Sequence, residues 1–305
     1  MKIVLFGRGG QVGGELVPRL SGCGELLAYD AEGANFERPA DVAALVRAAR
    51  PDVVVNAAAY TAVDRAETEA ARARIVNAET VAALAKEVRR LGALLVHYST
   101  DYVFDGAKAG AYVEDDAPAP LSVYGRTKLE GEQAIARSGC RHWIFRTSWV
   151  YAARGRNFVQ TMLKLARERE TLQVVDDQVG APTPAALIAD VTTAFMRRLG
   201  GAQSPADGIY HLAPHGETSW CGFARMILAT ARDLGGLLRC PPERVAAIST
   251  AEFPLPARRP LNSRLCTAKL EKMLGEKLPA WQDGVPAVVK DIMAEDIEQG
   301  RQHRR

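Results

Sequence analysis

Tyr124 and Lys128 are the first residues whose types and spacing suggest chemistry, in the string Tyr-Gly-Arg-Thr-Lys. On a helix, a spacing of four residues places both side chains on one face. An ammonium beside a phenol favours the phenolate and lowers the phenol pKa from its usual value of about 10, so that Tyr124 can exchange a proton at neutral pH. Thr100 lies in a hydroxyl-rich string, residues 99–104, at the end of an apolar run. The three residues predict acid–base chemistry at a tyrosine.

A second cluster lies near the start of the chain, where the apolar residues 2–6 continue into Gly-Arg-Gly-Gly-Gln-Val-Gly at residues 7–13. Gly7 permits a tight turn, Gly10 lets the backbone approach a pyrophosphate, and Gly13 permits close packing of the next helix on the strand. The N-terminal N–H groups of that helix attract an anion. This context predicts a dinucleotide site for NADPH or NADH.

The preference between the two dinucleotides is open at this stage. Asp30 ends the second apolar run, at the place where a carboxylate binds the adenosine ribose and disfavours a 2′-phosphate. Arg8 within the glycine string and Arg38 after the second run could instead bind a 2′-phosphate through the two N–H groups of a guanidinium.

The elements that must position these residues follow a βαβ rhythm. Five short apolar runs, at residues 2–6, 25–30, 52–56, 93–98 and 142–147, alternate with stretches of helical period such as 41–50 and 66–91. Near-continuous apolar runs are typical of parallel strands that are buried on both faces. The fold class predicted is therefore α/β, a Rossmann-type doubly wound parallel sheet over residues 1–150.

A smaller C-terminal substrate-binding lobe is predicted over residues 151–305. It would contain helices at residues 157–170, 185–199 and 219–234 and one strand at 208–212. The loops at 176–184 and 254–264 would form walls of a cleft against the first lobe, since ligands of such sheets lie at the carboxyl ends of the strands. Whether the chain interleaves the two lobes is left open.

Composition excludes several classes of function. The 39 Lys and Arg against 36 Asp and Glu are mixed along the chain, so no nucleic-acid-binding stripe is expected, and the basic residues 301–305 are interpreted as a solvated chain end. Five cysteines without a CxxC pair, and no long uncharged apolar stretch, predict a cytoplasmic protein without a membrane partner. His211 and His215 have zinc-like spacing with Glu217 nearby, but Pro214 interrupts any helix that would align them.

Longer strings resemble the extended short-chain dehydrogenase/reductase superfamily and, more narrowly, the dTDP-4-dehydrorhamnose reductase family. They span nearly the whole chain: residues 10–13 (GQVG), 56–64 (NAAAYTAVD), 97–104 (HYSTDYVF), 145–151 (FRTSWVY), 177–183 (DQVGAPT) and 257–264 (ARRPLNSR).

The resemblance implies a reaction and a catalytic set. The family reduces the C4 ketone of dTDP-6-deoxy-L-lyxo-4-hexulose to dTDP-L-rhamnose with a nicotinamide cofactor, the last step in the synthesis of that sugar. Tyr124 would donate a proton to the forming alkoxide, and Thr100 would orient the carbonyl oxygen. Lys128 would hold the nicotinamide ribose and lower the tyrosine pKa.

The resemblance also implies the binding residues. For the cofactor they are Gly7, Gly10, Gln11, Val12, Gly13, Asp30, Asn35, Phe36, Ala59, Tyr60, Thr61 and Tyr98, besides Tyr124 and Lys128. For the substrate they are Asp101 and Trp149 at the sugar, with Thr100, and Arg259 and Asn262 in a second-lobe loop that suits a nucleotide diphosphate.

Two departures from the family pattern bear on metal and dimer. Asn35 stands where the family often has Asp, which removes a charge near the adenine. Some members bind Mg²⁺ at a dimer interface through acidic side chains; Glu15 matches, but Pro184, Ala185 and Ala186 stand where a second acid is wanted. We therefore expect no metal site and no dimer of that style, and leave homodimerisation itself open.

Two alternatives remain. A non-enzymatic regulatory subunit of methionine adenosyltransferase has similar strings and binds a dinucleotide, but such a module has no need for the intact set Thr100, Tyr124 and Lys128. A reductase of another 4-keto nucleotide sugar would use the same residues, because the epimer formed depends on pocket geometry.

Overall fold

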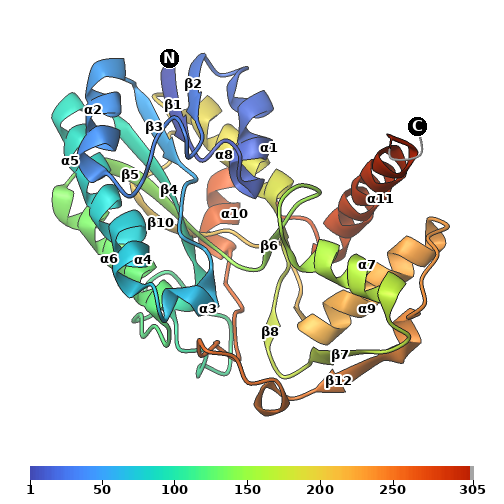
Figure 1. Ribbon diagram of the computed structural model, residues 1–305. Coiled ribbons are helices and arrows are strands. Elements are labelled where there is room, and N and C mark those ends of the chain that lie inside the picture. Colours follow the sequence, from blue (N-terminus) through green and yellow to red (C-terminus); the bar gives the residue numbers. More distant parts are fainter. Residues whose placement is uncertain (303–305) are drawn as a thin grey trace.

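The computed structural model describes the backbone of residues 1–302 and the side chains of residues 1–295, so the side chains of the basic cluster at 301–305 lie outside the described part. Figure 1 shows a larger lobe built around a twisted sheet and a smaller helical lobe beside it. Among the described helices, none has the length and hydropathy of a membrane span.

The large sheet confirms the predicted fold class. It contains six strands: β1 (Lys2–Phe6), β2 (Glu25–Tyr29), β3 (Val53–Asn56), β4 (Leu94–Thr100), β5 (Arg141–Thr147) and β10 (Gly208–His211). They run in the order β10-β5-β4-β3-β1-β2, and every neighbouring pair is parallel. The chain reverses its direction of winding between β1 and β3, which is where ligands bind in doubly wound sheets.

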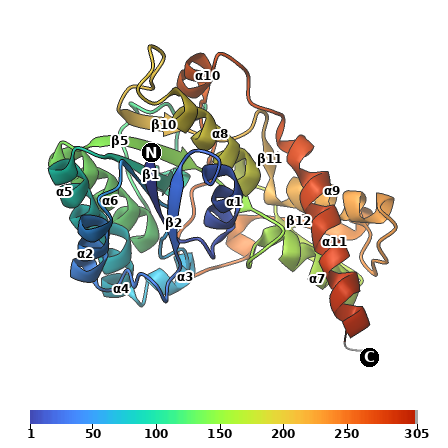
Figure 2. The same cartoon turned by 90° about the horizontal axis from the view of Figure 1, so that it is seen from above.

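Helices cover both faces of this sheet, because successive strand residues point to opposite sides. Ile3 and Leu5 of β1 pack with α1 (Gln11–Leu20), α8 (Ala185–Arg198) and α10 (Ala268–Leu274). Val4 and Phe6 pack on the other side with α2 (Pro39–Ala49) and α5 (Thr80–Leu91). Figure 2, seen from above, shows α2, α5 and α6 (Val123–Ser138) apart from α1 and α8, with the strands between them.

The expected helix at residues 66–91 is interrupted. The structure has two short helices, α3 (Val63–Ala66) and α4 (Ala70–Arg74), and then a π-helical turn, Ile75–Glu79, that leads into α5. The turn contains Asn77, whose buried side chain accepts from the Tyr60 N–H at 2.8 Å and donates to the Tyr60 carbonyl at 3.0 Å. This pairing ties the loop after β3 to the helix layer.

The smaller lobe has its own hydrophobic core, formed by α7 (Phe158–Glu168), α9 (Trp220–Asp233) and α11 (Val285–Gln302). Two short parallel strands, β7 (Leu172–Val175) and β12 (Val245–Ile248), close one side of it. Between the lobes the chain forms two two-residue strand pairs: β6 (Val150–Tyr151) with β9 (Thr183–Pro184), and β8 (Val179–Gly180) with β11 (Thr218–Ser219). The C-terminal end of α11 extends away from both lobes (Figure 1).

The two lobes are interleaved in sequence. We expected the strand at 208–212 and the helix at 185–199 in the second lobe, and this was wrong: β10 is an edge strand of the large sheet, and α8 packs against α1. The physical reason is that a parallel strand beside β5 needs a crossover helix, which α8 provides after the chain returns from the small lobe.

Candidate functional site

The glycine string forms a turn that only glycine permits. Gly7 has φ +86°, and a Cβ atom there would lie 2.7 Å from the carbonyl carbon of Ala57. A Cβ atom on Gly13 would lie 2.0 Å from the Gly7 carbonyl oxygen, so the first turn of α1 packs directly on the end of β1. Gly10 precedes α1 and offers no side chain to cap it. The N–H groups of the first turn are therefore available to an anion.

A groove of about 510 Å³ runs from this turn across the ends of β1, β2 and β3. Its lining includes seven of the residues expected at the cofactor: Gly7, Gly10, Asp30, Asn35, Phe36, Ala59 and Tyr60. Glu37 and Arg72 also line the groove, and the sequence analysis did not predict them. They form an ion pair at 2.7 Å. No local sequence pattern marks a pair of residues so far apart in the chain. The groove has the close backbone approach and the helix N-terminus that a dinucleotide requires.

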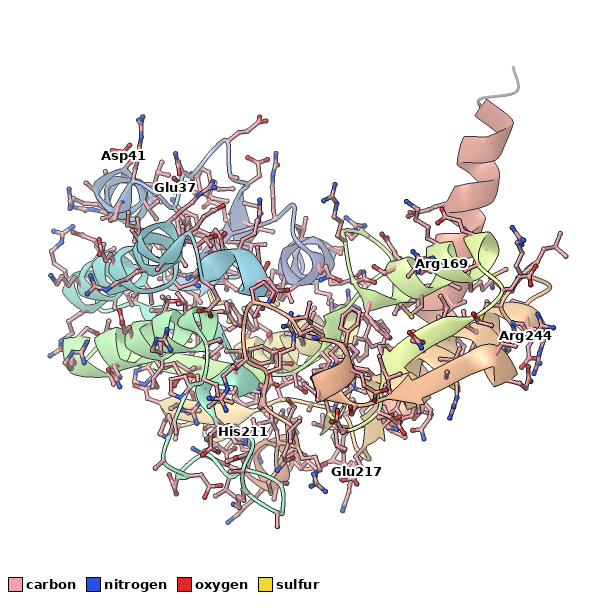
Figure 3. All side chains as sticks on the ribbon, turned by 60° about the horizontal axis from the view of Figure 1, so that its bottom comes forward. Glu37, Asp41, Arg169, His211, Glu217 and Arg244 are labelled. Carbon is pink, nitrogen blue, oxygen red and sulfur yellow. The ribbon has the colours of Figure 1, made fainter. Side chains whose placement is uncertain are left out.

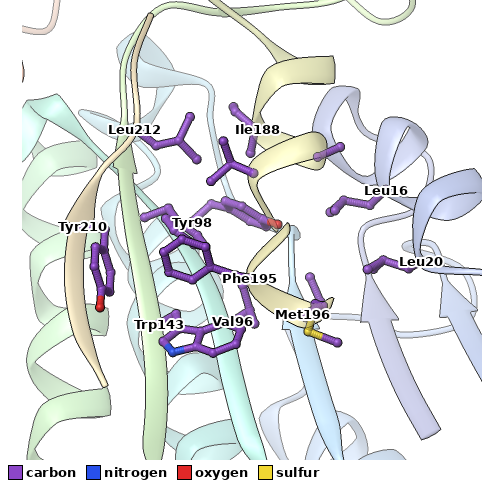
Figure 4. Packing of buried hydrophobic residues seen from close by; sticks show 14 of the residues in the cluster. Leu16, Leu20, Val96, Tyr98, Trp143, Ile188, Phe195, Met196, Tyr210 and Leu212 are labelled. Carbon is purple, nitrogen blue, oxygen red and sulfur yellow. The ribbon is translucent and has the colours of Figure 1, made fainter. Parts of the chain in front are cut away.

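Other expected cofactor residues lie outside this lining. Gln11 accepts a hydrogen bond of 3.0 Å from Asn157 of the smaller lobe, Val12 packs against the core, and Thr61 is exposed. Tyr98 differs most from expectation, since its side chain is buried in the core and its hydroxyl lies 2.8 Å from that of Thr192 (Figure 4). Only the backbone of Tyr98 faces the site, because alternate residues of β4 point to opposite faces.

At the adenosine end, Asp30 and Arg8 are partners rather than alternatives. Asp30 Oδ2 accepts from Arg8 Nε at 2.9 Å and Nη2 at 2.7 Å. The Gly33 N–H and the Arg8 guanidinium hold the pKa of the Asp30 carboxyl below its usual value. Arg38 is exposed and lies 3.8 Å from Asp41. A ribose hydroxyl can therefore bind the carboxylate, while a 2′-phosphate would meet the guanidinium beside it.

The proton donor expected from sequence lies at the carboxyl end of β4. The Ser122 hydroxyl caps α6 by accepting from the Gly125 N–H at 3.1 Å. A Cβ atom on Gly125 would lie 2.2 Å from the Tyr102 carbonyl oxygen, so α6 packs closely on the turn that follows β4. This approach brings the Tyr124 phenol beside the Thr100 hydroxyl, close enough for that hydroxyl to act on the phenol pKa. The structure thus brings together two residues 24 positions apart.

The protonation of Tyr124 differs from the sequence-based expectation. Burial raises its pKa to about 12, although the hydrogen bond to Thr100 acts in the opposite direction. The expected lowering by Lys128 is absent from this arrangement, because Lys128 Nζ donates to the Tyr98 carbonyl at 2.6 Å. Burial lowers the pKa of Lys128 itself to about 8, against the effect of Glu132. Tyr124 is therefore a neutral phenol that carries a proton to give.

Among the described residues, three buried polar atoms without protein partners lie near the carboxyl ends of β4 and β5. They are Ser99 Oγ on β4, Asp101 Oδ2 directly after β4, and Thr147 Oγ1 at the end of β5. Asp101 Oδ1 accepts from the Thr100 hydroxyl at 3.0 Å, and burial raises the pKa of Asp101 to about 6. Since buried polar groups are nearly always paired in proteins, this cluster fits a polar ligand such as a carboxamide or a sugar.

Trp149 lies directly before β6, in the segment that leads from the larger lobe to the smaller one. It has φ +50°, a strained value for a bulky residue. Its ring stacks on that of Trp220 with centroids 3.8 Å apart, and a Cβ atom on Gly180 would lie 3.0 Å from the same ring. Trp220 belongs to α9, and no local pattern in the sequence predicts its stack with Trp149.

Arg259 and Asn262 hold the loop that joins the lobes. The Arg259 guanidinium donates to the Asp64 carboxylate at 3.0 and 2.8 Å. Asn262 donates to the carbonyls of Lys108 and Gly110 at 2.7 and 2.8 Å. Both residues therefore fasten residues 257–264 to the larger lobe.

The structure places the candidate metal ligands apart. His211 is buried beside the Tyr112 carbonyl, His215 pairs with Glu271, and Glu217 pairs with Arg264. Figure 3 labels His211 and Glu217. Glu15 and Asp190 share a different partner, the Arg19 guanidinium, at 2.8 and 2.6 Å. Within the described residues, no three His, Cys, Asp or Glu side chains gather at metal-binding distance.

A family model, sequence relatives and a solved structure all relate this chain to the same kind of protein. The family model described as the RmlD substrate binding domain matches residues 1–294. The dTDP-4-dehydrorhamnose reductase of Burkholderia thailandensis is 47% identical over 300 residues, which cover 97% of this chain and 100% of the relative. A Streptomyces antibioticus protein named probable dTDP-4,6-dihydroxy-2-methyloxan-3-one 4-ketoreductase is 37% identical and covers 96% of both chains. The crystal structure of dTDP-4-dehydrorhamnose reductase from Bacillus anthracis in complex with NADP superposes with a TM-score of 0.84 at 31% identity, over 96% of this chain and 99% of that one.

Proposed function

The chain belongs to the RmlD substrate binding domain family, and from this premise we propose that it reduces the C4 ketone of dTDP-6-deoxy-L-lyxo-4-hexulose to dTDP-L-rhamnose. This reaction is the last step in the synthesis of that nucleotide sugar. The observation that carries the proposal is the placement of the Tyr124 phenol beside the Thr100 hydroxyl at the carboxyl end of β4, on the same sheet edge as the glycine turn after β1.

A bound NADPH or NADH supplies the hydride that reduces C4. The neutral Tyr124 phenol donates its proton to the oxygen of the forming alkoxide, and its raised pKa keeps that proton in place until charge develops. The Thr100 hydroxyl, which donates to Asp101 Oδ1 in this structure, would turn its proton to the same oxygen and orient the carbonyl. One hydride and one proton convert the ketone to an alcohol, and Tyr124 then regains its proton from solvent.

Asp101 and Trp149 are our proposed sugar contacts. Asp101 adjoins Thr100 and has an unpartnered carboxyl oxygen, so a sugar hydroxyl can complete its hydrogen bonds. The Trp149 ring is stacked on Trp220 and is 9% exposed, so we propose that the exposed part of this ring packs against the sugar.

Arg259 and Asn262 contribute in a different way from the direct diphosphate contact suggested by sequence. Arg259 is engaged with Asp64 and Asn262 with two backbone carbonyls, so we propose that both hold the loop at residues 257–264 beside the substrate. A partner-free guanidinium would suit a phosphate better, because it would keep all its donors for the ligand.

Measuring ketone reduction distinguishes the proposed reductase from the regulatory module, and identifying the product distinguishes it from a reductase of another sugar. A regulatory module would bind a dinucleotide without reducing a ketone, and a phenol placed beside the Thr100 hydroxyl has no evident use there. A reductase of another 4-keto nucleotide sugar would use the same pair, as similarity to the Streptomyces antibioticus 4-ketoreductase suggests. We also propose a cytoplasmic location, which five free cysteines support, and leave homodimerisation to a light-scattering measurement.

The experiment is an oxidation assay with NADPH and with NADH on dTDP-6-deoxy-L-lyxo-4-hexulose made in situ, followed by NMR identification of the product. Formation of dTDP-L-rhamnose supports the proposal. Measurable cofactor binding without turnover would favour the regulatory module, and a different epimer would favour the other reductase.

A further inference from the structure

His97 is a buried histidine that the proposed reaction does not use. It lies on β4, is fully buried, and stands between Asn56 of β3 and Lys128 of α6. Its Nδ1 is 3.1 Å from Asn56 Nδ2, and its Nε2 is 3.4 Å from Lys128 Nζ. Each ring nitrogen of His97 therefore has one neighbour, and the neighbour of Nε2 is Lys128, which belongs to the catalytic set expected from the sequence.

The hydrogen bonds of Asn56 decide which nitrogen of His97 carries the proton. Asn56 Oδ1 accepts from the Ala58 backbone N–H at 3.1 Å, so the amide group must turn its Nδ2 towards His97. An amide NH₂ donates only, and His97 Nδ1 must therefore accept. Burial and the charge of Lys128 lower the pKa of His97 well below its usual value, which leaves a neutral ring. A neutral ring that accepts at Nδ1 carries its hydrogen on Nε2.

This tautomer points an N–H group at Lys128. An ammonium has three donors and no acceptor, so it cannot pair with the His97 Nε2–H, whereas a neutral amine has a lone pair that can. The Tyr98 carbonyl, 2.6 Å from Lys128 Nζ, is the strong acceptor that remains for the lysine. His97 thus opposes the charged form of Lys128 on one side while Tyr98 holds the nitrogen on another.

The other groups around Lys128 are accounted for. Glu132, one turn further along α6, favours the ammonium, but its carboxylate already accepts two bonds from Arg146 of β5, at 3.0 and 2.7 Å. Tyr124, one turn earlier, is neutral. His97 is therefore the polar neighbour of Lys128 whose N–H group faces the positive charge.

We propose that His97 is a positioning residue for Lys128, which Asn56 fixes as the Nε2–H tautomer so that it aligns the lysine nitrogen on the Tyr98 carbonyl and makes the ammonium easier to deprotonate. The relevance to turnover rests on the proposed function, while the tautomer and the titration of Lys128 can be measured without any substrate.

The first test reads the tautomer in the native protein. The chain has 5 histidines, and long-range ¹H–¹⁵N NMR of the ¹⁵N-histidine-labelled protein separates protonated from unprotonated ring nitrogens. His97 is assigned as the resonance set missing from His97→Gln. A protonated Nε2 and an unprotonated Nδ1 at neutral pH are expected. The reverse assignment would overturn the proposal, because Nε2 would then accept from the ammonium.

The second test replaces the donor by an acceptor. In His97→Gln the amide oxygen can reach the ammonium, so the titration of Lys128, followed by ¹³Cε NMR of labelled lysine, should move up by about one pH unit. The weakening of NADPH binding at high pH should move up equally. His142→Gln is the control, since His142 is partly buried, contacts the Cys140 carbonyl and does not touch Lys128.

The results of these tests distinguish a failure of the proposed role of His97 from a failure of the proposed function. An unchanged Lys128 titration in a folded His97→Gln would refute the role of His97 even if the enzyme turns over normally. A shifted titration in a protein that reduces no dTDP sugar would instead leave the role of His97 intact and refute the function. If His97→Gln does not fold, the native tautomer remains the deciding measurement, with the assignment made through Asn56→Ala.

Discussion

Replacing Tyr124 by phenylalanine tests the assigned proton donor. The change removes one hydroxyl and keeps the ring, which contacts Tyr102 edge to face at 5.7 Å. The lost contact between the phenol and the Thr100 hydroxyl should cost no more than about 0.5–1.5 kcal/mol of unfolding free energy. General acid catalysis contributes roughly 10²–10⁴ in rate, so kcat should fall by that factor, which is about 3–5 kcal/mol in activation free energy. The affinity for NADPH should stay within about threefold, because binding does not need the proton.

The assay compares initial rates of NADPH oxidation with the binding constant from NADPH fluorescence and the unfolding midpoint in urea. Tyr210→Phe is the matched control: its hydroxyl donates to the Ala206 carbonyl at 2.8 Å, on the edge strand away from the site. That variant should lose similar stability and keep full activity. If Tyr124→Phe kept a kcat within about tenfold of the wild type, another group would be the proton donor and the reasoning would fail.

Three further predictions follow from the geometry. Because Lys128 loses its charge as pH rises through about 8, kcat/KM and NADPH affinity should both fall above that pH, and a profile flat to pH 10 would contradict the assignment. Arg8→Ala should weaken NADPH binding by about tenfold and leave NADH, which Asp30 can still bind, within about threefold, as titration with each cofactor will show. Arg146→Met should destabilise the fold by about 3–5 kcal/mol, because it leaves the carboxylate of Glu132 buried and unpaired; an unchanged urea midpoint would refute this.

Most of the large sheet could be predicted from sequence because its strands are continuous apolar runs. Residues such as Val53, Val54 and Val55 are buried on both faces, and no other local structure explains such a run followed by a polar turn. The edge strand β10 was assigned to the wrong lobe for the opposite reason. Its partner, β5, lies some 60 residues earlier in the chain, and pairing over that distance leaves no local pattern.

The helix at residues 66–91 shows how a tertiary contact overrides local propensity. Its alanine-rich sequence favours one continuous helix, yet the structure inserts a π-helical turn so that Asn77 can bind the backbone of Tyr60. The prediction recognised the helical composition and could not recognise the partner.

At the candidate site, the structure corrects one expectation about protonation. Tyr124 and Lys128 were predicted as a pair from their spacing, and Thr100 joined them through the family resemblance. The lowered tyrosine pKa was wrong, because burial raises this pKa and Lys128 is turned to the Tyr98 carbonyl. His97 and Trp220 act through contacts with residues far away in the chain. Such contacts depend on the packing of separate elements, which composition and spacing do not encode.

The most direct test of the central claim is the transfer of deuterium from NADPH that carries it on the nicotinamide C4. Incubation with dTDP-6-deoxy-L-lyxo-4-hexulose should give dTDP-L-rhamnose whose sugar C4 carries deuterium, seen by NMR as loss of the H4 signal. Cofactor oxidation without this product, or a 4-epimer in its place, would contradict the assigned reaction.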